Sequence, residues 1–324
     1  MDYKSIRNLA TMFFERADTL GDKPFLWAKA DGEYRALSWS RAASEVERLA
    51  RGLRALGIEA GDRVVLVSEN RPEWVIADLA IMAVHAISVP AYITNGVADH
   101  RHLLTDSSAK AVILSNAGLA EKILPAAKDA GSVRFAIAME AVDSGDSNVA
   151  IHLWDDLLDR HDGSDPPDAE SIGSDETACL IYTSGTGGAP KGVMLSHANM
   201  VFMARIWVEM RETHESDRLY CVLPITHIYG LANGVFGAIA AGASVEMEAR
   251  FDAKRLYEAL GAGTTLLQGV PAMYAKLLEY MEAEGLALNA PDLRYVSGGG
   301  AFVDLDLKHR MEKMLGLPFI NGYG

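Results

Sequence analysis

Cysteine is scarce in this chain of 324 residues, and this limits both the fold classes and the cellular compartments that suit it. Only Cys179 and Cys221 are present, and each lies inside a run of apolar residues. Two isolated thiols cannot build a disulfide framework, which excludes a small secreted disulfide-rich domain. The pattern indicates two buried core cysteines and predicts a reducing, cytoplasmic location.

Positively charged residues are fewer than negatively charged ones. Lys and Arg number 30 against 44 Asp and Glu, which gives a formal net charge of −14. Such a negative field repels the polyphosphate backbone of nucleic acids. The composition therefore predicts no nucleic-acid partner, and it leaves a homodimer open.

Long uninterrupted apolar runs are missing. Charged residues recur throughout residues 1–18, whereas an export signal needs an apolar stretch of about 7 to 15 residues. Residues 74–93 are interrupted by Asp78, and residues 228–245 are rich in glycine. An aspartate at the centre of a membrane helix is costly, so both segments are predicted to be buried elements and no transmembrane segment is predicted.

A cluster of metal ligands is missing as well. Among the nine histidines, His100 and His102 stand close together, and such a pair alone does not make a zinc site. The sequence predicts no metal site built from protein ligands.

The residues that are present have an ordinary globular composition. Hydrophobic residues make up 49% and charged residues 23%, and the length suits about two domains. Apolar residues recur at helical spacing over residues 40–56, Gly57 follows as a stop, and residues 64–67 form an aliphatic run. This predicts an amphipathic helix followed by a buried parallel strand.

The same alternation continues along the chain and predicts the α/β fold class, with mainly parallel sheets flanked by helices. Residues 161–177, which are polar and acidic, are predicted to be a solvated connector without a packed element. The other predicted helices cover residues 73–85, 100–107, 118–130 and 196–210, and the predicted strands cover residues 86–90, 111–114, 134–138, 178–182, 218–223 and 293–297.

The most informative segment is residues 182–193, which read YTSGTGGAPKGV between a predicted strand and a predicted helix. Glycines let backbone N–H groups turn inward as an anion nest, and hydroxyls add further donors. The ammonium of Lys191 brings a mobile positive charge to phosphate oxygens. The segment therefore predicts a phosphate-binding loop.

Three other loop patterns do not match this segment. GxxxxGK[ST] fails at Pro190 and Gly192, GxGxxG fails at Pro190, and GxSxG around Ser184 fails at Tyr182. These failures exclude the P-loop of NTPases and argue against an α/β-hydrolase. They also count against a NAD-dependent oxidoreductase, which stays a weak alternative.

The loop resembles the [YF]TSGTTGxPKG segment of the AMP-forming acyl-CoA synthetases, the acyl- and aryl-CoA ligases of the adenylate-forming superfamily. Gly187 stands where that family has a second threonine, which removes one hydroxyl and keeps the backbone donors. Three further segments resemble the family in the same order. Residues 223–230 match LPxxHxxG, residues 293–302 match the strand and turn that carry the adenine, and residues 321–324 match the start of [NE]GYGxTE.

The resemblance implies ATP with Mg²⁺ and coenzyme A as cofactor and co-substrate, and a small carboxylic acid as substrate. It implies catalytic roles for Thr186, Lys191 and His227. It implies acid-binding roles for His227, Gly230, Gly269 and Val270. The implied nucleotide-binding residues, of which the last would stack on the adenine, are Thr183, Ser184, Gly185, Thr186, Gly187, Gly188, Lys191, Gly298, Gly299, Gly300, Ala301, Asn321, Gly322 and Tyr323.

The resemblance also implies a layered αβαβα fold, in the form of an incomplete N-terminal adenylation domain. One subdomain would comprise residues 1–60 and 212–324, and the other residues 61–211, whereas composition alone suggests a break at residues 161–177. The family's ribose-binding aspartate, hinge and C-terminal domain would follow residue 324 and are absent from this chain. We therefore expect weak or absent turnover from these 324 residues.

In the full-length enzyme, the resemblance implies activation of a fatty or aryl acid to acyl-AMP, followed by thioester formation with coenzyme A. Ala232 and Asn233 offer no charge for a substrate ammonium, which disfavours the amino-acid-activating branch. A catalytically incomplete nucleotide-binding module is the alternative. Binding of AMP without formation of acyl-AMP would favour it.

Overall fold

The computed structural model describes residues 6–30, 33–162, 167–183 and 188–322. The described strands form two sheets of seven strands each. Sheet A has the order β14-β13-β12-β10-β11-β1-β2, and sheet B has the order β7-β6-β5-β3-β4-β8-β9. The pairings are parallel except for the antiparallel pairs β1–β2 and β8–β9, each of which places an antiparallel strand at a sheet edge.

The strand bounds agree with most of the predicted strands. Sheet A contains β1 Pro24–Ala30, β2 Glu33–Ser38, β10 Arg218–Cys221, β11 Ser244–Met247, β12 Leu266–Gly269, β13 Tyr295–Gly298 and β14 Phe319–Asn321. Sheet B contains β3 Arg63–Val67, β4 Ile87–Pro90, β5 Ala111–Leu114, β6 Phe135–Ala138, β7 Ala150–Leu153, β8 Thr177–Thr183 and β9 Lys191–Ser196.

Successive side chains of the parallel strands enter different cores. In β3, Val64 and Leu66 join the core between the two sheets, whereas Val65 and Val67 join the core on the outer face of sheet B. In β10, Leu219 and Cys221 face the central core, whereas Tyr220 faces the outer core of sheet A. Because both faces of these strands are covered, they are apolar throughout.

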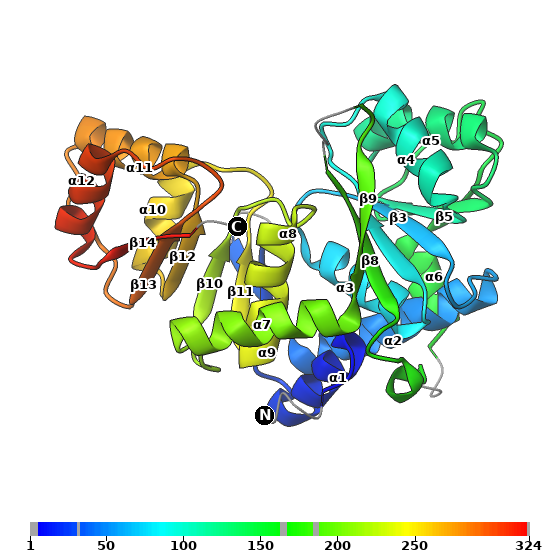
Figure 1. Cartoon of the computed structure of the whole chain (residues 1–324), viewed down its shortest axis with the longest axis horizontal. Helices are drawn as coiled ribbons and strands as arrows, with labels where there is room; N and C mark the ends of the chain where they lie inside the picture. Colours follow the sequence, from blue (N-terminus) through cyan, green and yellow to red (C-terminus); the bar gives the residue numbers. More distant parts are fainter. Residues whose placement is uncertain (1–5, 31–32, 163–166, 184–187, 323–324) are drawn as a thin grey trace.

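The helices fill the layers that the strands leave, and the predicted αβαβα arrangement is confirmed (Figure 1). The outer face of sheet B is covered by α4 Val97–Ser107 and α5 Ala117–Ala130, and that of sheet A by α10 Ala253–Gly261, α11 Pro271–Glu284 and α12 Leu305–Leu315. The central layer contains α1 Leu9–Leu20, α2 Trp39–Ala55, α3 Pro72–Ala83, α6 Trp154–Arg160, α7 His197–Arg211, α8 Ile228–Gly230, the π-helical turn η2 Leu231–Phe236 and α9 Gly237–Ala241.

Local hydrogen bonds explain where the predicted elements begin and end. The Ser38 hydroxyl accepts from the amide of Arg41 at the start of α2, and Ser196 caps α7 in the same way. The strand predicted over residues 218–223 ends earlier, at Cys221. The carbonyl of Cys221 at the strand end and that of Leu223 beyond it accept hydrogen bonds from the side chain of Asn70.

The prediction of a wholly solvated connector over residues 161–177 is wrong in its second half. Residues Ala169–Ser171 form the 3₁₀ turn η1, and Ala169 and Ile172 are buried. The carbonyls of both residues accept hydrogen bonds from the Asn8 side chain. Two apolar side chains and a buried amide thus pack part of a segment whose composition is mostly polar.

The chain changes sheet at two places, between β2 and β3 and between β9 and β10. Residues 161–177 connect β7 to β8 within sheet B. The subdomain limits near residues 60 and 212 stay a prediction. In the described ranges, no helix is both long and apolar enough to cross a bilayer.

The features that were not predicted include α1, the β1–β2 hairpin, β7, α6, α12, β14 and β9. The last of these refines the phosphate-loop prediction, which placed Lys191 and Gly192 in the loop between a strand and a helix. Both residues belong to β9, where they pair with Thr183 and Tyr182 of β8. Strand pairing therefore fixes Thr183 and Lys191, the residues at the two sides of the loop.

Asp78 on α3 is a buried carboxyl group in the central core, 1% exposed. Burial raises its pKa from 3.8 to about 7, and the hydroxyl of Ser88 offsets this only in part. Between about pH 4 and pH 7 the carboxyl group is protonated in the folded chain. In the unfolded chain the same group is ionised over this range. Its contribution to the free energy of unfolding therefore falls as the pH rises through this window.

We expect Asp78→Asn to stabilise the chain above pH 7, by up to about 4 kcal/mol, because the amide needs no proton to stay neutral. Urea unfolding of both proteins between pH 4 and pH 8 measures the difference. The gain should grow across this window, whereas the exposed control Asp175→Asn should give a difference that does not change with pH. A pH-independent gain for Asp78→Asn would contradict the prediction.

Candidate active site

The carboxyl ends of the two sheets meet at Asn70, which follows β3. Its Nδ2 donates to the carbonyls of Cys221 and Leu223 at 3.3 and 2.9 Å, and the amide of Ile225 donates to its Oδ1 at 3.1 Å. Three hydrogen bonds of one buried side chain thus join sheet B to the segment after β10. Ligands of open α/β sheets bind outside the carboxyl ends of the strands, so the candidate site lies at this junction.

The predicted phosphate loop is the tip of the β8–β9 hairpin. Thr183 and Lys191 are directly opposed in the two strands and both are exposed, so their side chains project from one face of the hairpin. Gly188 has a φ of 133°, which strongly favours glycine. Ser184, Gly185, Thr186 and Gly187 lie outside the described residues.

Two side chains anchor the base of this hairpin. The Tyr182 hydroxyl donates to Oδ2 of Asp106 at 2.7 Å, and Nε2 of His102 donates to the carbonyl of Pro190 at 2.7 Å. A Cβ on Gly192 would lie 3.1 Å from the ring of Tyr182, so the glycine permits this close approach. The sides of the loop are therefore held to α4.

A cavity of about 330 Å³ opens beside the hairpin. Thr183, Pro190 and His227 line it, together with residues after β4 and on α4. The cavity brings the predicted phosphate loop and the predicted acid-binding histidine to one place. Their roles in binding stay predictions.

His227 is held in one tautomer. Its Nδ1 accepts a hydrogen bond from the amide of Tyr229 at 3.1 Å, which leaves the proton on Nε2. Partial burial lowers its pKa, so the ring is neutral near pH 7. A neutral Nε2–H can donate to a carboxylate oxygen without bringing a charge to the site.

Gly230 explains why this segment requires glycine three residues after the histidine. A Cβ at this position would lie 2.4 Å from the carbonyl oxygen of Pro224. Gly230 is buried, and the chain folds back on the segment that precedes His227. The structure thus gives Gly230 a backbone-packing role, and its contact with a substrate stays a prediction.

The second group of predicted residues gathers at the carboxyl edge of sheet A. Gly298 pairs with Gly269 on one side and with Asn321 on the other. The amide of Gly322 donates to the carbonyl of Gly298 at 2.9 Å, and Val270 lies beside Gly300. The predicted adenine and acid segments are therefore adjacent, with Gly299 and Ala301 in the turn that follows β13. Tyr323 lies outside the described residues.

Sequence reasoning missed Tyr229, which connects the two groups. A Cβ on Gly299 would lie 3.3 Å from the Tyr229 ring, so this ring lies directly against the glycine turn. Tyr229 stands two residues after His227, and no motif quoted for the family marks it. Asn70 was also missed, although a polar residue shortly after a buried strand is a usable signal.

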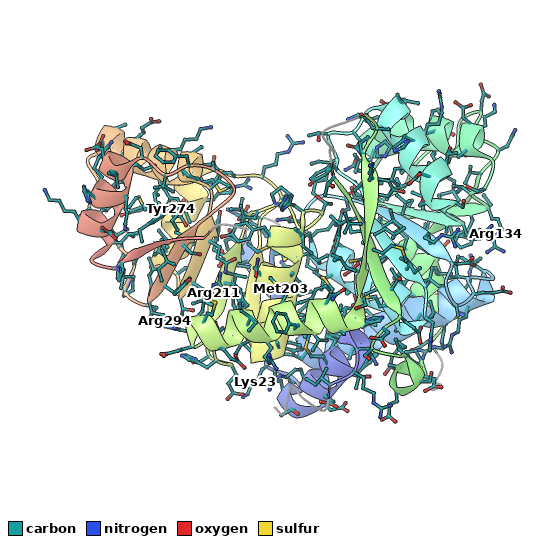
Figure 2. The ribbon with its side chains drawn as sticks, in the orientation of Figure 1. Lys23, Arg134, Met203, Arg211, Tyr274 and Arg294 are labelled. Carbon is teal, nitrogen blue, oxygen red and sulfur yellow. The ribbon has the colours of Figure 1, made fainter. Side chains whose placement is uncertain are left out.

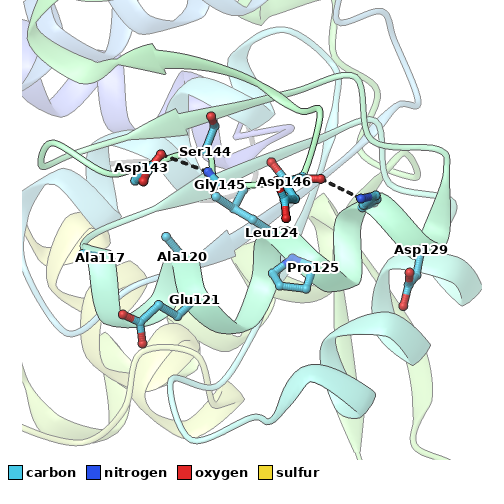
Figure 3. Close-up of a pocket in the computed structure, with 12 residues that line it drawn as sticks. Ala117, Ala120, Glu121, Leu124, Pro125, Asp129, Asp143, Ser144, Gly145 and Asp146 are labelled. Carbon is cyan, nitrogen blue, oxygen red and sulfur yellow. Dashed lines mark hydrogen bonds between the residues drawn. The ribbon is translucent and has the colours of Figure 1, made fainter.

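A further cavity, of about 470 Å³, lies between α5 and residues 143–147 (Figure 3). Leu124 and Pro125 of α5 line it together with acidic side chains that include Asp143. The amide of Gly145 donates to Oδ1 of Asp143 at 3.0 Å and closes the turn. None of the residues that line this cavity belongs to the predicted site.

Comparison with known proteins agrees with this geometry. The AMP-binding enzyme family matches residues 13–324, and the chain belongs to this family. It is 31% identical to the long-chain-fatty-acid–CoA ligase FadD15 of Mycobacterium tuberculosis, with 87% of this chain and 46% of the relative covered. It is also 31% identical to a feruloyl-CoA synthase of an Amycolatopsis species, with 89% of this chain and 54% of the relative covered.

Solved structures show the same fold. The inhibitor-bound N-terminal domain of FACL13 from Mycobacterium tuberculosis is 25% identical, with a TM-score of 0.85 over 98% of this chain and 76% of that chain. The anthranilate CoA ligase AuaEII in complex with anthranoyl-AMP has a TM-score of 0.88 at 19% identity, over 100% of this chain and 61% of that chain. The chain spans about half the length of the curated relatives it matches.

Proposed function

We propose that this chain provides the nucleotide- and acid-binding part of an AMP-forming acid–thiol ligase. The ligase would activate a fatty or aryl acid with ATP and transfer the acyl group to coenzyme A. One observation carries the proposal: Thr183 and Pro190 of the β8–β9 hairpin line the same cavity as His227, where the carboxyl ends of both sheets meet. The family match and the relatives named as CoA ligases support it.

The chemistry requires an anion to attack a polyanion. The acid carboxylate would attack the α-phosphorus of ATP, which forms acyl-AMP and releases pyrophosphate, and the thiolate of coenzyme A would then displace AMP. Neutralisation and positioning are the main tasks of such a site. Lys191 and the backbone donors of the loop suit the departing pyrophosphate, and the Nε2–H of His227 suits an oxygen of the acid.

Magnesium would enter with ATP and offset the charge of its phosphates. The part of the chain that the structure describes contains no group of three or more His, Cys, Asp or Glu side chains arranged to hold a metal ion. The residues that fit the nucleotide are the donors of the hairpin, with Thr183 and Lys191 at its sides. The adenine would lie along the turn after β13, at Gly298 and Gly299.

Calorimetric titration of the 324-residue chain with ATP, AMP and NADH tests the nucleotide preference. We expect ATP and AMP to bind and NADH not to bind. Pyrophosphate exchange into ATP with a panel of fatty and aryl acids then tests for acyl-AMP. AMP binding without pyrophosphate exchange would favour the nucleotide-binding module. A chain that binds neither ATP nor AMP would contradict both the ligase and the nucleotide-binding module.

A further inference from the structure

Arg211 is the last residue of α7 (Figure 2), and its guanidinium lies against two aromatic rings on the inner face of sheet A. Its Cζ is 5.3 Å from the ring centroid of Trp207 and 5.4 Å from that of Tyr295 in β13. A guanidinium between two rings is held in plane and keeps its N–H edge directed outward. The side chain is therefore fixed in orientation.

A polar contact ties Arg211 to the predicted acid-binding segment. The side-chain oxygen of Gln268, when turned toward these donors, accepts from Nε1 of Trp207 at 2.6 Å and from Nε of Arg211 at 3.3 Å. Gln268 is buried in β12 and directly precedes Gly269. This arrangement uses Nε, and the guanidinium also interacts with the side chains of Tyr295 and Tyr229.

Arg211 has no carboxylate partner in residues 6–30, 33–162, 167–183 and 188–322, although partial burial lowers its pKa. Nearby arginines of sheet A are paired: Arg218 with Glu246, and Arg294 with Asp217. A desolvated cation without a counter-charge costs free energy, and proteins usually pair such groups. An unpaired guanidinium beside a binding segment is thus suited to an anionic ligand group.

Hydroxyl-bearing side chains lie along β13 between Arg211 and the glycine turn. Tyr229 lies against Gly299, and its side chain interacts with that of Arg211. The hydroxyl of Ser297, which is 3% exposed, lies beside Tyr229 and makes no hydrogen bond of standard geometry within the described structure. A row of polar groups therefore runs along β13 from the carboxyl edge to Arg211.

We propose that Arg211 selects the acid substrate by pairing with an anionic group at its distal end, so that the preferred acids are dicarboxylic. The inference rests on the proposed function. One carboxylate would lie at His227 and the glycine turn, and the other at the terminal nitrogens of Arg211. From Gly298 to Tyr295 the strand spans roughly 10 Å, which suits a short linear diacid and not a long fatty chain.

Acid selectivity in Arg211 variants tests this inference. The wild-type chain, Arg211→Gln and Arg211→Lys are titrated with AMP, and then with matched acids in the presence of AMP: hexanoate against adipate, and octanoate against suberate. We expect the wild type to prefer at least one diacid over its monoacid about tenfold, the glutamine variant to lose this preference, and the lysine variant to keep part of it. The exposed Arg310→Gln serves as the matched control and should change nothing.

The outcomes separate the two proposals. If the wild type does not bind AMP, the proposed function fails. If it binds AMP but shows no preference for either diacid, or keeps the preference in Arg211→Gln, the assignment of Arg211 is wrong. Thermal unfolding identifies a variant that does not fold, and in that case the wild-type ratio and Arg211→Lys decide.

Discussion

Replacement of Lys191 by alanine should weaken ATP binding about tenfold to a hundredfold, because a charge-assisted contact to phosphate oxygens contributes about 1.5 to 3 kcal/mol. Lys191 is exposed at the start of β9 and opposes Thr183 across the hairpin. Its removal should affect ATP more than AMP, since the pyrophosphate moiety is present only in ATP. Isothermal titration with both nucleotides measures the two affinities.

The structure offers a matched control for this change. Lys254 lies on α10, and its side chain is 66% exposed with an ion pair to Glu258. Lys254→Ala removes the same charge from the molecule and should leave both affinities within twofold of the wild type, because exposed charges at a distance are screened by salt. Equal losses in the two variants would mean that Lys191 acts only through net charge, and the phosphate-loop assignment would be wrong.

The second large effect is expected at Gly230. Gly230→Ala should lower the free energy of unfolding by about 3 kcal/mol or more, because its Cβ would lie 2.4 Å from the backbone oxygen of Pro224. A backbone atom in this position cannot move aside by changing a rotamer. The shift of residues 223–227 should also displace His227. Urea denaturation measures the loss of stability.

Gly234 gives a comparison within the same helical segment. A Cβ there would lie 3.8 Å from the nearest atoms, which belong to Cys221 and Leu219, and this is ordinary van der Waals contact. Gly234→Ala should therefore be neutral or slightly stabilising, since alanine favours the helix. The two glycines form a GxxxG pattern in the sequence, yet the structure distinguishes them. Similar losses in both variants would contradict this distinction.

The layered fold could be predicted because parallel strands that are covered on both faces need continuous apolar runs. Val64 to Val67 is such a run, and its side chains divide between two cores as the period of a strand requires. The β1–β2 hairpin was harder to predict because β2 is half exposed and carries Glu, Tyr and Arg. Its position depends on the distant strand β11, and no local pattern encodes that pairing.

The predicted site depended on local motifs, so its parts were found separately and their connections were not. Gly269, Gly298 and Asn321 lie in neighbouring strands because the sheet order places β12, β13 and β14 side by side. Tyr229 and Arg211 were missed because their roles depend on contacts between elements that are distant in the sequence. A tyrosine in a loop and an arginine at the end of a helix are common features, and only packing reveals that they face the same strand.

The pairing of β1 with β11 also has a consequence for biosynthesis. Leu26 pairs with Val245, so the hairpin is synthesised long before its parallel neighbour exists. At roughly 5 to 20 residues per second, a ribosome needs on the order of 10 to 40 seconds to make the intervening chain. During that time sheet B can form, whereas the apolar side chains of β1 and α1 have only part of their core. A nascent chain of this kind is a natural client for chaperones that shield exposed strands until the last partner emerges.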